Sequence, residues 1–362
     1  MPTLSLQSFF TAAFIVVNAV QVSAQPVTLP RTPSPGAMVS QTVGISTITV
    51  NYSRPSVKGR EIWGALVPYG WNKQGFGPGN SAPWRAGANE NTVLTLSHDA
   101  TVQGYHVPAG SYGLFFVINK DNTAQVVLSK DYKSWGSFFY DEALDEMRAD
   151  IQLREIPSRE MLTYEFENST KTSSELVLDW EKKQFPVKIE FAVDSIVMAN
   201  ADQELKGSTG FTAQGFLSAA NYALQNKINY DRALVWADKA LTQNKNFRAL
   251  NIKAELLKAV GKTTEGDALM KEATFMATEN ELNQYAYQLL AAGDQDKAIG
   301  IFILNTQRNP KSANVWDSLG EGYVGKGDKK NALVCFKKSL SLNPPENVRL
   351  NSEKFLKQLG SM

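Results

Sequence analysis

Cysteine and histidine are almost absent from this chain, which has one cysteine and two histidines among 362 residues. The single cysteine, Cys335, cannot form a disulfide within the chain, so the fold must depend on hydrophobic cores. Because Cys335 lies beside Phe336 on an expected helix, we predict a buried structural thiol rather than a nucleophile. His98 and His106 leave little material for a metal site or a catalytic triad. We therefore expect no metal, no cofactor and no recognisable catalytic residue.

An excess of charge and the common catalytic motifs are also lacking. Lys and Arg number 37 against 36 Asp and Glu, which argues against broad attraction to nucleic acid or anionic membranes. There is no Gly-x-Ser-x-Gly elbow, and the glycine-rich run 70–79 lacks the Lys-Ser/Thr ending of a phosphate-binding loop. Hydrophobic residues at 43% and charged residues at 20% are typical of a globular protein with room for two domains.

Long apolar runs are missing except near the start. Residues 9–20 form an apolar run broken by Asn18, and Val22-Ser23-Ala24 offers a signal-peptidase site. We expect a signal peptide over residues 1–24, hence an exported, periplasmic or secreted protein. An N-terminal membrane anchor or a disordered tail is the alternative, because the run follows no Lys or Arg. The segment 25–36 is rich in proline and predicts a linker.

A period of two dominates residues 37–193. Strands are predicted at 46–52, 93–98, 113–119, 125–130, 151–156, 162–167, 176–180 and 187–193, with a hairpin turn at 120–123. Many short strands without helical spacing between them indicate an antiparallel β-sandwich or a jelly-roll-like barrel. A long insertion, rich in tryptophan and arginine, separates the first two of these strands. Insertions of that length in a compact domain are usually functional or disordered, and its composition favours function.

Several motifs of this region resemble domain-of-unknown-function family 2911. They are Arg-Pro-x-x-Lys-Gly-Arg-x-Ile-Trp-Gly (54–64), Leu-Val-Pro-Tyr-Gly (66–70), Trp-Arg-x-Gly-Ala-Asn-Glu (84–90), Pro-Ala-Gly-x-Tyr (108–112) and Trp-Gly (135–136). The resemblance covers roughly 37–193. It implies an exported protein, commonly from Bacteroidota-type bacteria and sometimes carrying C-terminal tetratricopeptide repeats, and it brings no established activity.

Helical spacing dominates the C-terminal half. Trp316, Leu319, Gly320 and Tyr323 share one helix face, a second stripe contains Ala332 and Phe336, and Pro344 ends it. This is the tetratricopeptide pattern, and weaker copies precede it, one at an offset of 34 residues. We predict a linker at 194–213, an α-solenoid of about four helical hairpins at 214–346, and a capping helix at 347–362.

The first candidate site is in the long insertion. Its residues are Arg54, Lys58, Arg60, Trp84, Arg85 and Glu90. Guanidinium groups beside aromatic faces suit an anionic or sugar ligand. The alternative is that these arginines pair internally with carboxylates and fasten the insertion.

Carboxylates offer two further possibilities. Asp141, Glu142, Asp145, Glu146 and Asp150 lack the spacing of a calcium loop, so we expect a solvated helical turn. Glu61 and Glu90 would support glycoside hydrolysis only if they faced one cleft about 5–10 Å apart.

The second candidate site is the concave face of the repeats. The tetratricopeptide resemblance assigns Asn251, Asn283, Tyr287, Asp317 and Glu321 to that face. A protein or peptide partner or a purely structural array would fit these polar positions. The favoured hypothesis is an exported, non-enzymatic adaptor that binds a partner through its repeats and a ligand through the insertion. The alternative is a hydrolase or carbohydrate-active envelope enzyme built on residues 54–90.

Overall fold

A computed structural model describes residues 33–73, 75 and 79–360. The predicted signal peptide and most of the proline-rich linker therefore lie outside the described residues. The chain divides between Glu190 and Phe191 into two compact units, and the turn Val43–Ser46 is grouped with the second. We call them the β unit and the helical unit. Within the described ranges, no helix combines the length and the apolarity needed to cross a bilayer.

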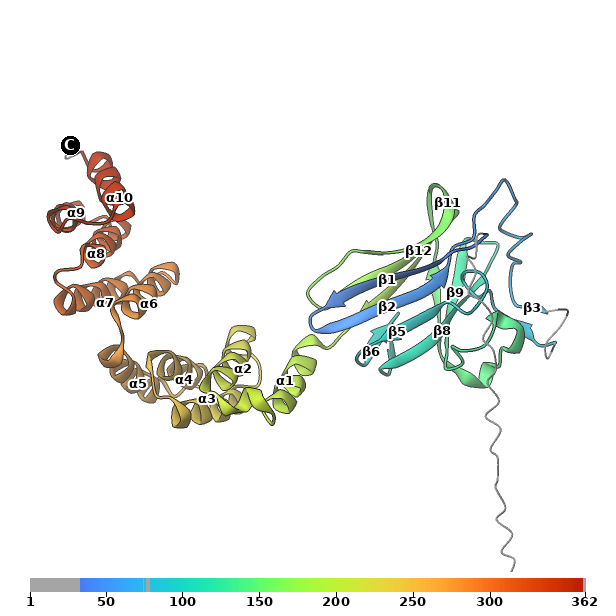
Figure 1. The fold of residues 1–362 in the computed structure, drawn as a ribbon, viewed down its shortest axis with the longest axis horizontal. Coiled ribbons are helices and arrows are strands. Elements are labelled where there is room, and N and C mark those ends of the chain that lie inside the picture. The colour runs from blue at the N-terminus through green and yellow to red at the C-terminus, as the bar shows by residue number, and fades with distance from the viewer. Residues whose placement is uncertain (1–32, 74, 76–78, 361–362) are drawn as a thin grey trace, which may run out of the picture. The chain divides into compact units, whose positions relative to one another are not determined.

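Two open antiparallel sheets form most of the β unit (Figure 1). The six-stranded sheet contains, in spatial order, β1 (Gly36–Val43), β2 (Ser46–Ser53), β5 (Val93–Leu96), β8 (Gly110–Ile118), β9 (Thr123–Ser129) and β10 (Asp145–Gln152). The four-stranded sheet contains β11 (Arg154–Glu167), β12 (Ser173–Glu190), β6 (Ala100–Val102) and β7 (Tyr105–Val107). The predicted antiparallel architecture is confirmed, and neither sheet closes into a barrel within the described residues.

The main core lies between these sheets. The inward-facing residues of β2 and β8 are fully or almost fully buried. In β2 they alternate with more exposed residues, because successive side chains of a strand point to opposite faces of the sheet. Tyr52 of β2 meets Tyr164 of β11 with ring centroids 4.7 Å apart, and Phe116 of β8 meets Phe185 of β12 at 4.9 Å. These contacts pack one sheet on the other as a sandwich.

A second, smaller core covers the opposite face of β8 and β9. Phe115, Val117 and Val127 pack there against Ala82 and Tyr140. The covering residues belong to the short hairpin of β3 (Asn72–Lys73) and β4 (Ser81–Ala82), and to the segment with 3-10 helices η1 (Gly136–Phe139) and η2 (Glu142–Leu144). Central strands covered on both faces lose the alternation of buried and exposed residues, as β8 does.

Two expectations for this unit need correction. The acidic segment 141–150 is not one helical turn, because only Glu142–Leu144 is helical and β10 begins at Asp145. Met147, Ala149 and Ile151 are buried in alternation, which favours the strand. The strands predicted at 176–180 and 187–193 belong to one strand, β12, which pairs with β11 as far as Gln184 and with β6 at Ile189 and Glu190. The second of them ends at Glu190, because α1 begins at Val193.

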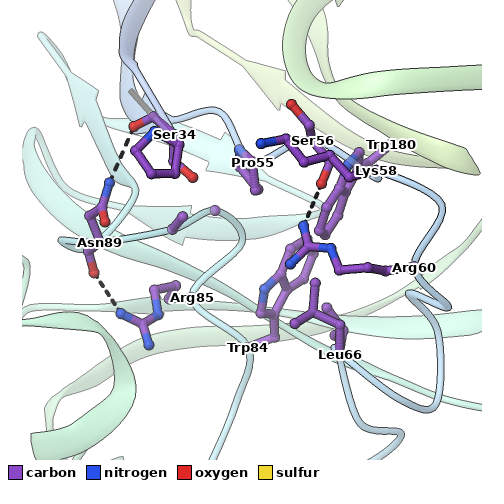
Figure 2. Close-up of a pocket in the computed structure, with 14 residues that line it drawn as sticks. Ser34, Pro55, Ser56, Lys58, Arg60, Leu66, Trp84, Arg85, Asn89 and Trp180 are labelled. Atoms are coloured by element: carbon purple, nitrogen blue, oxygen red, sulfur yellow. Dashed lines mark hydrogen bonds between the residues drawn. The ribbon is translucent and has the colours of Figure 1, made fainter. Parts of the chain in front are cut away.

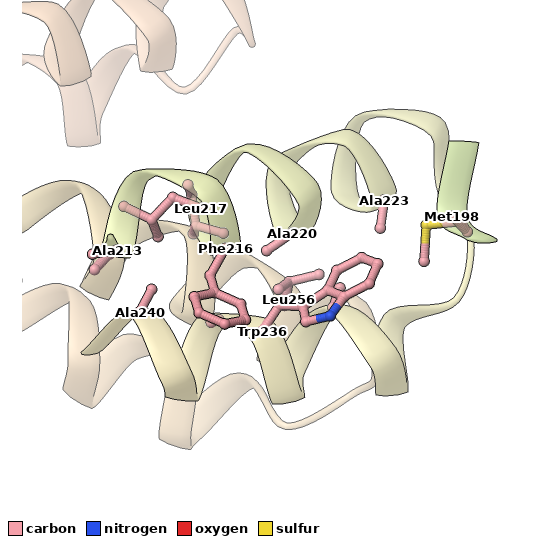
Figure 3. Close-up of a cluster of buried hydrophobic side chains, with 13 residues drawn as sticks. Met198, Ala213, Phe216, Leu217, Ala220, Ala223, Trp236, Ala240 and Leu256 are labelled. Atoms are coloured by element: carbon pink, nitrogen blue, oxygen red, sulfur yellow. The ribbon is translucent and has the colours of Figure 1, made fainter. Parts of the chain in front are cut away.

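The helical unit begins earlier than the sequence suggested. The segment 194–213, predicted as a linker, contains most of α1 (Val193–Glu204) and the 3-10 helix η3 (Ser208–Phe211). Met198 of α1 belongs to a cluster with Phe216, Ala220 and Trp236 (Figure 3). Burial of one face of α1 therefore makes it part of the helical fold, although its own amphipathic pattern is weak.

Four antiparallel helical pairs and a final helix follow. They are α2 (Ala213–Asn226) with α3 (Tyr230–Gln243), α4 (Phe247–Ala259) with α5 (Thr263–Met276), α6 (Glu279–Ala291) with α7 (Gln295–Arg308), α8 (Ala313–Lys326) with α9 (Lys329–Ser341), and α10 (Glu346–Gln358). The repeat register read from the sequence agrees with these helices. Cys335 is 3% exposed in α9, and burial raises the pKa of its thiol to about 12, so it is a structural residue.

The α8–α9 pair depends on close approach at a glycine. A Cβ added at Gly320 would lie 2.7 Å from the Phe336 ring, which is itself completely buried. On the same helix, a Cβ at Gly325 would meet nothing within 4 Å. A substitution at Gly320 therefore tests packing against Phe336, whereas the same substitution at Gly325 tests helix propensity alone.

We predict that Gly320→Ala lowers the free energy of unfolding of the helical unit, because overpacking costs about 1–3 kcal/mol. Gly325→Ala should leave it unchanged or raise it by up to about 1 kcal/mol through helix propensity. Urea unfolding followed by circular dichroism at the helical minimum measures both. Equal stability of the two variants would show that the helices do not meet at Gly320.

Candidate functional site

The start of the insertion is fastened to β11 by its backbone. Val57 N–H donates to the carbonyl of Glu160 at 2.8 Å, and Ser56 forms an isolated bridge with Met161. Arg54 donates from Nε to the Leu162 carbonyl at 3.0 Å and from Nη2 to Thr163 Oγ1 at 2.7 Å. The Arg54 guanidinium therefore fastens the insertion, as the structural alternative proposed, although its partners are not carboxylates.

A tight turn after this anchor presents two cations. Lys58 and Gly59 both have left-handed φ, at 49° and 68°, so the chain reverses direction there. The Lys58 amide donates to Glu160 Oε1 at 2.9 Å, while its side chain is exposed. Arg60 folds back over the turn, and its Nε donates to the Val57 carbonyl at 3.1 Å while its Nη2 donates to the Ser56 carbonyl. The turn thus fixes the Arg60 guanidinium.

Arg85 approaches from the other end of the insertion. Its Nη1 donates to the Asn89 carbonyl at 2.6 Å, and its guanidinium carbon lies 4.9 Å from the centroid of the Phe138 ring. Burial lowers the pKa of Arg85 below its usual value. Gly136, at φ +64°, makes room for the Arg85 guanidinium, because a Cβ at this position would collide with it. Arg85 is therefore held without a ligand.

The turn around Arg85 is fastened at its backbone. Ala86 and Asn89 adopt left-handed φ, at 52° and 61°, a conformation that costs alanine energy. The Ala86 carbonyl accepts hydrogen bonds from Tyr164 Oη and Thr92 Oγ1, both at 3.0 Å. Asn89 Nδ2 donates to the Ser34 carbonyl at 3.2 Å. These buried bonds hold the strained turn in place.

Three tryptophans join the insertion to β12. Trp84 stacks on Trp180 with centroids 5.8 Å apart and planes at 15°, and Trp63 meets both edge-on. Trp63 Nε1 donates to Glu181 Oε2 at 3.1 Å, whereas Trp180 Nε1 is buried without a hydrogen-bond partner in the described part of the chain. The indoles bring both ends of the insertion together.

A cavity of about 450 Å³ lies between these parts (Figure 2). Figure 2 shows Lys58, Arg60, Trp84 and Trp180 on one side of it and Arg85 with Asn89 on the other. Its remaining lining residues are Pro33, Ser34, Pro55, Ser56, Leu66, Val67, Gly87 and Ala88. Three cationic side chains line the cavity, and no Asp or Glu does so among the residues that the structure describes. We call this cavity the cationic pocket.

The structure brings together only part of the predicted site. Lys58, Arg60, Trp84 and Arg85 line the cationic pocket, whereas Arg54 is bonded to β11 and Glu90 lines a different pocket beside β1 and β2. Glu61 is exposed and lines neither of these pockets. The two carboxylates required by the hydrolase hypothesis therefore do not share either cavity. Sequence reasoning missed Trp180, since its strand pattern gave no signal of a contact with Trp84.

The acidic segment forms a network of its own. Arg148 donates from Nε to Asp145 Oδ2 at 2.6 Å and from Nη2 to Tyr140 Oη at 3.0 Å, and its guanidinium lies over the Trp71 ring. Burial is the largest influence on Asp145 and raises its pKa despite these bonds. In the described ranges, no cluster of His, Cys, Asp and Glu could hold a metal ion. The network fastens β10 to its covering segment.

Four of the five candidate groove residues of the helical unit form hydrogen bonds to a neighbouring first helix. Asn283 Nδ2 donates to Ser318 Oγ at 3.0 Å, and Tyr287 Oη donates to Glu321 Oε2 at 2.8 Å, so both connect α6 with α8. Asn351 of α10 donates to Asp317 Oδ2 at 2.8 Å, and it also donates to Glu321. Asn251 of α4 keeps a buried Oδ1 without a partner among the described residues. Most of these side chains therefore hold successive first helices together.

Comparison with known families gives a match over the β unit. Residues 34–189 match the family model described as Protein of unknown function (DUF2911). The match spans nearly the whole β unit, which ends at Glu190, and it confirms the resemblance seen in the sequence. The cationic pocket is thus a feature of the DUF2911 part of the chain.

Part of the chain is similar to other proteins. Two curated relatives, Superkiller complex protein 3 of Mus musculus and of Homo sapiens, are each 38% identical over 55 residues. These residues are 15% of this chain and only 4% of the length of each relative.

Three solved structures also match part of the chain, at low similarity. YrrB, described as a TPR protein with an unusual peptide-binding site, has a TM-score of 0.28 at 20% identity, covering 44% of this chain and 84% of its own. PilF of Pseudomonas aeruginosa has a TM-score of 0.28 at 20% identity, covering 42% and 71%. MamA has a TM-score of 0.28 at 16% identity, covering 42% and 89%.

We predict that Arg85→Lys lowers the stability of the DUF2911 unit without any ligand. Lysine loses the planar contact with Phe138 and the bond to Asn89, and a hydrogen bond to a charged group contributes about 1.5–3 kcal/mol. Arg60→Lys, at an exposed site, should cost less than about 0.5 kcal/mol. Thermal melts of the full chain compare the two variants. An equal loss in both would contradict the difference in burial described for the two arginines.

Proposed function

We propose that this protein is an exported binding protein without catalytic activity, whose DUF2911 unit holds an anionic group in the cationic pocket. The observation that carries the proposal is the convergence of Lys58, Arg60 and Arg85 on one cavity whose described lining contains no carboxylate. Like charges that line one cavity repel one another, and an anion bound there would relieve that repulsion. The pocket therefore suits a carboxylate, sulfate, phosphate or sugar acid.

The three cations would contribute differently. Arg60 and Arg85 are already bonded to backbone carbonyls, so binding would require little further ordering of their side chains. Guanidinium groups offer several donors each, so one bond to a carbonyl leaves others for an oxyanion. The Lys58 side chain makes no hydrogen bond or ion pair in the described part of the chain, so its charge is the one least involved in folding. The Trp84 ring beside them supplies an apolar face for the body of a ligand.

The helical unit supports a second part of the proposal, the binding of a protein or peptide partner. Its first helices α4, α6, α8 and α10 carry polar residues at one register, namely Asn251, Asn283, Asp317 and Asn351. Asn283 donates to Ser318 of α8, and Asn351 donates to Asp317 of α8, so these bonds fix the spacing of α6, α8 and α10. A fixed row of helices presents a continuous surface to an extended segment. A purely structural array would use the same bonds, and peptide binding distinguishes the two possibilities.

We predict that Lys58→Gln weakens anion binding while the fold stays intact. Sulfate, phosphate, citrate and galacturonate are tested at constant ionic strength, because exposed charges are screened by salt. Wild-type protein should bind at least one of these probes, and the variant should lose at least about tenfold in affinity. Lys171→Gln removes an equal exposed charge outside the pocket lining and should not change affinity. No binding by wild type, or equal binding by Lys58→Gln, rules out the site.

A peptide selected by display on the full-length protein tests the helical surface. Hydrogen–deuterium exchange should show protection on α4, α6 and α8 when that peptide is added, since the first helices carry the aligned polar residues. Protection on the second helices α5, α7 and α9 alone, or only on the β unit, would contradict this part of the proposal.

Export is predicted from the apolar run and the site at Val22-Ser23-Ala24. The intact mass of protein made in an export-competent host should lack residues 1–24. A full-length mass in the envelope fraction would indicate an uncleaved anchor instead.

A further inference from the structure

The four edge strands of the two large sheets differ in how well they are protected against pairing with a strand of another chain. An exposed edge strand invites pairing with another chain, and charges, prolines, bulges or shortness normally prevent it. The edge strand β10 carries Asp145, Glu146, Arg148 and Asp150, and β7 has only three residues. The edge strand β11 contains Pro157 and register shifts, and the insertion bonds to it at Glu160. These three edges are protected.

The fourth edge, β1, has none of these features. Its sequence from Gly36 to Val43 contains no charged residue and no proline over eight residues. Figure 1 shows β1 beside β2 at one side of the six-stranded sheet, and no other described strand pairs with it. Met38 at its outer face is 68% exposed.

The register of the β1–β2 hairpin identifies the free backbone groups. Gly44 and Ile45 form the turn, Ser40 Oγ lies 3.0 Å from Thr49 Oγ1, and Arg54 N–H donates to the Pro35 carbonyl at 2.9 Å. Because hydrogen-bonded pairs alternate along an antiparallel hairpin, the odd-numbered residues of β1 bond to β2. The N–H and C=O groups of Gly36, Met38, Ser40 and Thr42 therefore point away from β2.

We propose that β1 pairs antiparallel with β1 of a second copy of this chain, about a two-fold axis. Two identical strands match in length, and each outward donor of one copy meets an outward acceptor of the other. Neither strand carries a charge, so no like charges oppose each other. The neighbouring outer-face positions Thr47, Thr49 and Asn51 of β2 are also uncharged, and the pairing joins two six-stranded sheets. The proposal is independent of the anionic ligand.

Two substitutions at outward-facing positions test the pairing. Met38→Pro removes an N–H that β2 does not use, and proline is tolerated at such edge positions. Thr42→Lys places a charge on each copy at the edge, as protected edges do. Asn51→Lys adds the same charge to the same face one strand inside and is the matched control. Circular dichroism and thermal melts establish that each variant is folded.

Sedimentation velocity of the full-length protein is measured from low to several hundred micromolar. Wild type and Asn51→Lys should dimerise with rising concentration, and Thr42→Lys and folded Met38→Pro should weaken the dimer at least about tenfold. In wild type, the amides of Met38, Ser40 and Thr42 should exchange more slowly as the concentration rises. If Met38→Pro does not fold, Thr42→Lys decides. A wild type that stays monomeric throughout, or a dimer that Thr42→Lys leaves intact, overturns the proposal.

Discussion

The packing of three indoles is the constraint on which the β unit depends. Trp63 and Trp84 come from the long connection between β2 and β5, whose described residues form only short, isolated pairings among themselves. Trp180 comes from β12, and it packs against both of them. Burying large aromatic side chains removes much apolar surface from water, and paired rings add about 0.5–1.5 kcal/mol each. Because the connection is fixed at both ends in this way, Lys58, Arg60 and Arg85 reach one cavity. The strained backbone conformation of Ala86 is held by the two buried hydrogen bonds that its carbonyl accepts from Thr92 and Tyr164.

The helical unit obeys a different constraint, which is contact between successive helical pairs. Within one pair, Gly320 allows α8 to approach α9. Between pairs, Asn283, Tyr287 and Asn351 connect first helices to one another. The junction between the second and third pairs uses Tyr285 against Phe247 and the Arg308 guanidinium on the Thr274 carbonyl. Contacts of this kind make stability additive along the array, while each end needs a cover. Helix α10 covers one end, because Phe355 stacks on Phe336, and α1 packs at the other.

Local signals in the sequence predicted most of this fold. Alternation located β2, β5 and β9, and helical spacing with Pro344 located α8 and α9, because in these elements one face is buried and the other exposed. The helix α1 was missed, since its face is set by packing on α2 and not by its own periodicity. Strand β10 was mistaken for a helical turn because its charged residues, which lie on the less buried face of an edge strand, drew attention away from the alternation of Met147, Ala149 and Ile151.

The candidate site was predicted only in part, for a related reason. The motif 84–90 contained Trp84 and Arg85, which do line the pocket, but composition alone could not separate Arg54 and Glu90 from them. Which of these side chains share a cavity depends on contacts between residues about a hundred positions apart, such as Arg54 with Leu162 and Trp84 with Trp180. Likewise, the groove positions were correctly assigned to first helices, whereas their bonds to one another depend on the spacing of the repeats.

The central claim is that Lys58, Arg60 and Arg85 together form an anion site in the DUF2911 unit. Crystals soaked in tungstate or selenate test it most directly, because anomalous scattering locates the heavy oxyanion without reference to activity. The account predicts an anomalous peak between the Lys58 ammonium and the Arg60 and Arg85 guanidinium groups, lost in crystals of Lys58→Gln grown and soaked identically. Oxyanion peaks only at other surface cations, with the cationic pocket empty, would contradict it.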